Sequence, residues 1–139
     1  MSLIADIFFY NALMADNELV SMVDGRIFNP ARPTVDEEED QVPYIIISLD
    51  GGQNESETKD DVEGLTDNVN VSILCVANDR DALGTITEAV RKQVREYFHE
   101  QEDEEGTPND WQFSFSQVAY DPDKPCCFQT LSYQCDTFR

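Results

Sequence analysis

The sequence predicts an α+β domain in which an antiparallel sheet of about four strands carries helices on one face, in the order helix-strand-strand-helix-strand-strand. Two observations support this prediction. Apolar residues recur with helical spacing in two segments, whereas four other segments alternate between apolar and polar residues or are apolar throughout. Elements of both kinds bury one apolar face in a common core. The chain has 139 residues, the usual size of one domain, so we expect a single domain over residues 1–139.

The first predicted element is an N-terminal helix, because apolar residues recur there every three to four positions and no Gly or Pro precedes Gly25. Phe9 and Tyr10 are also apolar, so this helix has more than one apolar face. Such a helix is either enclosed by the core or packed on a second subunit. The second possibility makes Phe9 and Tyr10 candidate interface residues.

A shorter helical segment and two extended segments follow. Asp16 or Asn17 is the candidate N-cap of the short helix, and Gly25 is its stop. Extended structure begins at 26–28. The segment 42–49 is apolar at both alternate sets of positions, which fits a strand that is covered on both faces.

The most regular part of the chain is a strand over 69–77 followed by an amphipathic helix. Asn78 is the candidate N-cap of that helix, and its apolar stripe runs from Ala82 to Phe98. The side opposite the stripe holds the basic cluster, which consists of Arg91, Lys92 and Arg95. A solvated helix face explains such a cluster, and contact with the acidic loops of a neighbouring copy is the alternative.

Two closing strands complete the predicted sheet. Aromatic residues alternate with polar ones over 111–116, and apolar residues alternate with polar ones over 130–135. The sequence "YDPDKP", residues 120–125, has the composition of the turn between them.

The chain is strongly acidic, with 29 Asp and Glu against 9 Lys and Arg and a net charge of −20. Acids concentrate in three predicted loops near 34–41, 51–67 and 100–110. Such a field disfavours binding to nucleic acid or anionic membranes. Solubility or a saline medium explains the acidity, and a partner surface is the alternative. On the second view the candidate interface includes Asp36, Glu37, Glu38, Glu39 and Asp40.

Neither a leader nor a metal site is expected. The N-terminus lacks the positive segment of a signal peptide, and its longest apolar run, 7–10, is too short to span a bilayer. We therefore expect a soluble intracellular protein that binds no membrane. The four cysteines lack zinc-site spacing, so we expect reduced, buried thiols and no metal; they are Cys75, Cys126, Cys127 and Cys135.

The usual catalytic motifs are missing from the sequence. It contains no GxSxG, GxxxxGK[ST] or HExxH motif, and its single histidine is His99. We therefore expect no enzymatic activity, no catalytic residues and no cofactor. One function that fits the composition is mimicry of a nucleic acid, in which dense carboxylates occupy a basic groove on another protein.

Three stretches together resemble the tail-completion proteins of tailed phages, also called tail terminators: "LVSMVDGRIFNPARP", "VPYIIIS" and "NDRDALGTITEAVRKQVREYF". In that family "DGRIF" resembles a Gly-Arg-Ile-Tyr element, with Phe28 at the aromatic position, and "VPYIIIS" resembles the proline-tyrosine strand after it. The helix beginning at Asp79 is similar to an Ala-rich segment. The resemblance covers nearly the whole chain, which departs from the family in its long acidic loops.

The resemblance implies a ring, commonly a hexamer, that caps the tail tube, stops its polymerisation and joins the tail to the head connector. Its implied partners are other copies of itself, the tail tube protein, the head-tail connector protein and genomic DNA, which passes through without specific binding. It implies no catalysis and no cofactor, in a virion protein assembled in the host cytoplasm. We expect the loop of Asp36 to Asp40 to face the lumen or an adjoining ring, and the basic cluster to pair with a neighbour's acids.

Overall fold

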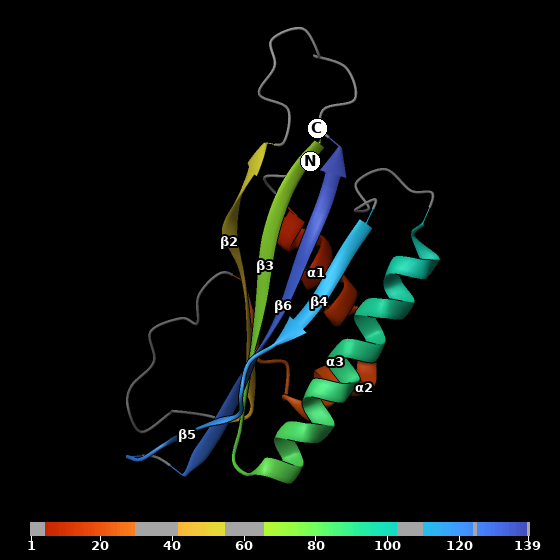
Figure 1. Ribbon diagram of the computed structural model, residues 1–139. Helices are drawn as coiled ribbons and strands as arrows, with labels where there is room; N and C mark the ends of the chain where they lie inside the picture. Colours follow the sequence, from red (N-terminus) through yellow and green to blue (C-terminus); the bar gives the residue numbers. More distant parts are fainter. Residues whose placement is uncertain (1–4, 30–41, 55–65, 103–109, 124, 139) are drawn as a thin grey trace, which may run out of the picture.

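The computed structural model describes residues 5–29, 42–54, 66–102, 110–123 and 125–138, which form three helices and a six-stranded sheet (Figure 1). In chain order the elements are α1 (Ala5–Met14), α2 (Asn17–Met22), β1 (Ile27–Phe28), β2 (Tyr44–Asn54), β3 (Thr66–Ala77), α3 (Arg80–Glu100), β4 (Asp110–Phe115), β5 (Ala119–Asp121) and β6 (Cys126–Phe138).

The α+β class is confirmed, but the sheet is mixed rather than antiparallel and has more strands than predicted. Its order is β1-β2-β3-β6-β4, with β5 beside β6. The other pairings are antiparallel, whereas β1 pairs with β2 in parallel, so that Ile27 lies opposite Ile45. Strands β1 and β5 have 2 and 3 residues. The extended structure expected at 26–28 corresponds to β1, but elements this short have no periodicity by which to count a strand, so the predicted order omitted both.

The three central strands are longer than the hydrophobic pattern suggested. Strand β2 continues to Asn54 and β3 begins at Thr66, so both ends of the predicted loop 51–67 belong to the sheet. A bulge separates Leu49 from Gly51, and Gly51 adopts a φ of 122°, a conformation that favours glycine. Backbone pairing therefore continues into a polar segment, where side-chain patterning gives no signal.

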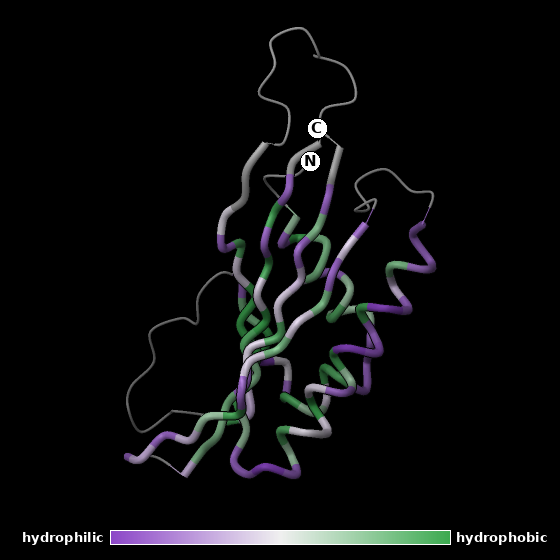
Figure 2. Tube along the Cα trace, in the orientation of Figure 1, coloured by the Kyte–Doolittle hydropathy of each residue, from purple (hydrophilic) through white to green (hydrophobic). Residues whose placement is uncertain are grey.

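The helices lie on one face of the sheet, and the core fills the space between the two layers (Figures 1 and 2). On β2, Ile45 and Ile47 are fully buried beneath the helices, whereas Ile46 on the opposite face is only half-buried. The strand predicted over 42–49 begins at Tyr44, and the expectation that it is covered on both faces is wrong, because only one of its faces is fully buried. Helix α3 is tied to α1 by Gln93 Nε2, which donates a hydrogen bond of 2.9 Å to the Ala12 carbonyl.

The other face of the sheet is polar across its centre, and no described helix covers it. Ser48, Ser72, Ser132 and Ser114 are neighbours on four adjacent strands. The hydroxyls of Ser48 and Ser72 are hydrogen-bonded at 2.9 Å. This row alternates with the buried positions of the same strands, as the period of two requires.

The N-caps of α2 and α3 lie at or next to the residues that the sequence predicted. Asp16 caps α2, and its side chain accepts a hydrogen bond from the Glu18 amide. The cap of α3 is Asp79 rather than Asn78, because the extended backbone of Asp79 lets its carboxylate accept from the Ala82 amide at 2.8 Å. Beyond α2 the chain turns at Gly25, which has a φ of 75°.

Candidate functional site

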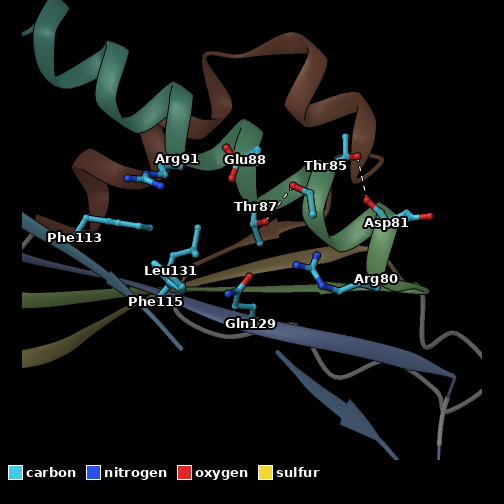
Figure 3. Close-up of a pocket in the computed structure, with 11 residues that line it drawn as sticks. Arg80, Asp81, Thr85, Thr87, Glu88, Arg91, Phe113, Phe115, Gln129 and Leu131 are labelled. Atoms are coloured by element: carbon cyan, nitrogen blue, oxygen red, sulfur yellow. Dashed lines mark hydrogen bonds between the residues drawn. The ribbon is translucent and has the colours of Figure 1, made fainter. Parts of the chain in front are cut away.

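A groove of about 900 Å³ lies between the N-terminal half of α3 and strands β4 and β6 (Figure 3). We call it the α3–β4 groove. Helix α3, strand β4 and strand β6 line it with Arg80, Asp81, Gly84, Thr85, Thr87, Glu88, Arg91, Phe113, Phe115, Gln129 and Leu131. It combines an aromatic floor with two guanidinium groups.

Small residues on α3 leave room for the groove. Thr87 points toward the strands, and its hydroxyl donates to the Gly84 carbonyl at 3.1 Å (Figure 3). A Cβ atom at Gly84 would lie 3.0 Å from the guanidinium Nη1 of Arg80. Glycine is unfavourable inside a helix by about 1 kcal/mol relative to alanine. Its presence here lets the Arg80 side chain lie along the groove.

The floor of the groove is formed by the last residues of β4. Phe113 and Phe115 point to the same face, with ring centroids 5.9 Å apart. Arg91 extends over Phe113, with its guanidinium carbon 4.6 Å from the ring centroid, which is a cation–π contact. Phe115 is 64% exposed. The alternation of β4 predicted its direction correctly but could not indicate that α3 leaves it uncovered.

At the other end of α3 the same layers close completely. Phe98 stacks on Trp111 with ring centroids 4.8 Å apart, and Phe9 lies 5.1 Å from Tyr133. With Phe8 these rings form the aromatic cluster. Burial raises the pKa of Tyr133, and its hydroxyl has no hydrogen-bond partner in the described part of the chain. The aromatic cluster is therefore a structural element that seals the core.

Basic charge is concentrated on α3, which carries four of the nine basic residues. These are Arg80, Arg91, Lys92 and Arg95. All four are exposed, and none forms an ion pair with another described residue. In a chain of net charge −20, unpaired cations on one helix face are available to carboxylates of a partner.

The predicted interface residues differ in their burial. Phe9 is 0% exposed and belongs to the chain's own core, so it is not available to a second copy. Tyr10 is half-buried against that core. The five acids from Asp36 to Asp40 lie outside the described residues, and the basic cluster is exposed as expected. The alternative of an enclosed first helix therefore holds for Phe9.

Of the eleven residues that line the groove, only Arg91 was among the predicted interface residues. The sequence "GTIT" at 84–87 gives a signal for Gly84, because it places small residues on one part of an otherwise bulky helix. Nothing in the sequence states that this part faces β4, since that depends on how the helix crosses the sheet. The exposure of Phe115 follows from the same crossing.

The cysteines behave as buried apolar residues. Cys75, Cys127 and Cys135 are buried, whereas Cys126 is half-buried. Burial raises the pKa of the Cys75 and Cys135 thiols to about 12, so both stay protonated at neutral pH and are poor nucleophiles. Within the described ranges, no group of three or more His, Cys, Asp and Glu is arranged to hold a metal, and no helix is long and apolar enough to cross a bilayer.

The two short motifs of the tail-terminator resemblance meet in space. The Ile45 amide donates to the Arg26 carbonyl at 2.9 Å, and Arg26 Nε donates to the Pro43 carbonyl at 2.9 Å. "GRIF" and "PYII" therefore form the parallel β1–β2 pair. The role of these residues is structural, because their hydrogen bonds hold the start of β2 against the turn after α2.

Comparisons with known proteins identify the fold. No protein-family model matches the sequence, and a search of curated proteins finds no match. Among solved structures, 19 chains match. One belongs to a structure described as "Virion of native gene transfer agent (GTA) particle"; it aligns with a TM-score of 0.54 and 12% identity over 92% of this chain and 90% of that chain. The two chains share a fold. At this identity the likeness concerns the fold alone.

Proposed function

We propose that this chain is a virion structural protein that forms a ring on the end of a phage or prophage tail tube. There it would terminate tube polymerisation and join the tail to the head connector. One observation carries the proposal: the fold is shared, over nearly the full length of both chains, with a chain of a gene transfer agent virion. The tail-terminator resemblance of "DGRIF" and "VPYIIIS" supports the finer assignment.

The proposed role is architectural and uses neither catalysis nor a cofactor. The partners are other copies of the chain, the tail tube protein and the connector protein, and the protein resides in the virion tail after assembly in the host cytoplasm. The net charge of −20 fits a ring through which DNA moves, because the acidic surface repels the phosphate backbone.

Tube capping tests the proposal directly. Tail tube protein encoded beside this chain is polymerised with and without the purified protein, and tube ends and lengths are measured by negative-stain electron microscopy. We expect a ring on one end and tubes that stop growing. Tubes that elongate equally in the presence of excess protein would contradict the proposed function.

The solution mass gives a second, independent test. Light scattering is recorded from low salt to about 1 M, where the Debye length falls to about 3 Å and self-repulsion is suppressed. A discrete multiple of the 15.8 kDa chain that becomes more populated with salt supports a ring. The tube assay decides whether that multiple acts at a tail end.

The excess of 29 acids over 9 basic residues favours a second candidate, mimicry of a nucleic acid. A mimic binds a basic protein with an affinity that falls steeply as salt rises, and DNA competes for the same site. Salt weakens the mimic's complex steeply, whereas it suppresses the self-repulsion that opposes a ring of acidic chains.

A further inference from the structure

Two aromatic side chains are far more exposed than the other large apolar residues that the structure describes. Tyr120 is 65% exposed and Phe115 is 64% exposed, whereas Ile7, the next in order, is 43% exposed. Phe115 lies in the α3–β4 groove, and Tyr120 lies on β5. Within one chain they do not cover each other, because Tyr120 is absent from the groove lining.

Tyr120 is carried by a hairpin that extends from the body of the sheet. Strand β5 pairs with the start of β6, so that Tyr120 lies opposite Cys127. Directly after β5 the Asp123 amide donates a hydrogen bond to Asp121 Oδ1 at 2.9 Å. In Figure 1 the hairpin leaves the sheet at the lower left, whereas α3 begins at the bottom centre and runs up to the right. The hairpin therefore points away from its own α3.

The hairpin and the groove are complementary in chemistry. The hairpin presents an aromatic ring followed by the carboxylates of Asp121 and Asp123. The groove presents the Phe115 ring between two cations, Arg80 and Arg91, neither of which has an ion-pair partner in the described part of the chain. Aromatic pairs and charge-assisted contacts in a partly desolvated groove both favour association.

Two acids, Asp81 and Glu88, also line the groove. Figure 3 shows the Asp81 side chain directed away from the strands, whereas Arg80 extends along the gap between helix and strands. Arg91 contacts the Phe113 ring of the floor. The absence of a side chain at Gly84 makes that position of Arg80 available.

We propose that the β5–β6 hairpin of one copy inserts into the α3–β4 groove of a second copy, with Tyr120 covering Phe115 and the hairpin carboxylates facing Arg80 and Arg91. This proposal rests on the proposed ring and names the contact that builds it. The two surfaces are different parts of the same chain, so the contact is head-to-tail. Head-to-tail contacts close into rings when the rotation between copies allows it.

Single variants measure the contact by sedimentation velocity. Tyr120→Ala removes the inserted ring and Arg80→Glu reverses one charge of the groove; each weakens self-association roughly tenfold or more, as expected for a central aromatic or arginine anchor. Circular dichroism confirms that the folds are intact. Ile7→Ala is the matched control, since it truncates an exposed apolar residue on α1. Loss of assembly in Ile7→Ala but not in Tyr120→Ala would overturn the proposal in favour of α1.

Mixing the variants tests the head-to-tail geometry. A hairpin variant, Tyr120→Ala with Asp121→Lys, keeps an intact groove, and the groove variant Arg80→Glu keeps an intact hairpin. Each variant associates more weakly alone than the unmodified chain, but the equimolar mixture forms a heterodimer through the one intact pair. A mixture that stays monomeric while the unmodified chain assembles would contradict the inferred contact.

Photo-crosslinking locates the contact and separates the two proposals. With p-benzoylphenylalanine in place of Tyr120, we expect crosslinked peptides from residues 80–91 or 113–115 of a second copy, identified with mixed isotope-labelled chains. Crosslinks elsewhere on a chain that still caps tail tubes would overturn this inference and leave the proposed function standing. Crosslinks in the groove without tube capping would support the contact and contradict the tail-terminator role.

Discussion

Helix α3 meets the sheet in two different ways along its length. Its C-terminal half is sealed by the aromatic cluster, in which Phe98 stacks on Trp111 at 4.8 Å. Its N-terminal half borders the α3–β4 groove, whose floor residue Phe115 is 64% exposed. Helix and sheet are continuous through both halves, so the size of the side chains decides whether the space between them is filled. Large rings fill it at one end, whereas Gly84 and Thr87 leave it open at the other.

The difference teaches that an open groove need not expose the core. In the sheet register Cys75 lies opposite Gln129, which lines the groove. Cys135 lies opposite Trp111, at the closed end. Both thiols are 0% exposed. The groove is thus a surface feature above a sealed interior.

The largest expected effect is on folding stability and comes from the closed end. Phe9→Ala should lower the free energy of unfolding by about 3–5 kcal/mol, because it opens a cavity among buried rings. Phe115→Ala should change it by no more than about 0.5 kcal/mol, as an exposed substitution does. Urea unfolding curves measure both. Equal losses would show that the two ends of α3 are equally packed.

Alkaline pH should have the next largest effect and tests whether the core is sealed at both ends. Burial raises the pKa of Cys75 and Cys135 from 9.0 to about 12, so the native state keeps protons that the unfolded chain releases. Stability is therefore unaffected below pH 9 and falls above it, by roughly 1 kcal/mol per pH unit for each thiol. Unfolding curves recorded from about pH 8 to 10 should show that the free energy of unfolding falls less steeply with pH in the double variant Cys75→Ala/Cys135→Ala than in the unmodified chain. The same pH dependence in both chains would contradict thiol burial.

A gain of stability is expected when the one unsatisfied group of the aromatic cluster is removed. The Tyr133 hydroxyl is buried without a partner in the described part of the chain, and the ring is 1% exposed. Tyr133→Phe keeps the ring and should stabilise the fold by about 1–2 kcal/mol. Thermal unfolding gives the sign. A destabilised variant would show that the hydroxyl makes a favourable hydrogen bond, for example to water.

The smallest effect is expected at the groove and again has a positive sign. Gly84→Ala should stabilise the chain by up to about 1 kcal/mol through helix propensity, since the contacted atom, Arg80 Nη1, is the end of a flexible side chain. The same change displaces Arg80 and should weaken self-association. His99→Ala is the matched control, because it adds helix propensity at an exposed position of α3 that does not line the groove. Stronger assembly in Gly84→Ala would break the link between groove shape and contact.

Several elements were predictable because their signals are local. The stripe of α3 repeats over many turns, and Leu131, Tyr133 and Cys135 alternate as the sequence indicated and are buried. The Asp16 cap needs only its own residue type and the helix that follows. Asn78 and Asp79 are equally good caps by type, so the backbone conformation decided between them.

The remaining features depend on contacts between distant segments. The parallel β1–β2 pair joins residues 27–28 to 45–46, and a two-residue strand carries no pattern of its own. Phe9 is apolar in a helix with several apolar faces, and only the packing of α1 against Phe98 and Tyr133 assigned it to the core rather than to a partner.

The sequence by itself determined the α+β class, the amphipathic α3, the alternating strands and the acidic charge, since each depends on residue type and short-range period. The tertiary structure alone decided the mixed sheet, the burial of Phe9 and the groove that leaves Phe115 open. The mixed sheet depends on the pairing of residues 27–28 with 45–46, and the groove depends on the angle and height at which α3 crosses the sheet. That crossing is set by side-chain volumes from several elements at once, and no single segment encodes it.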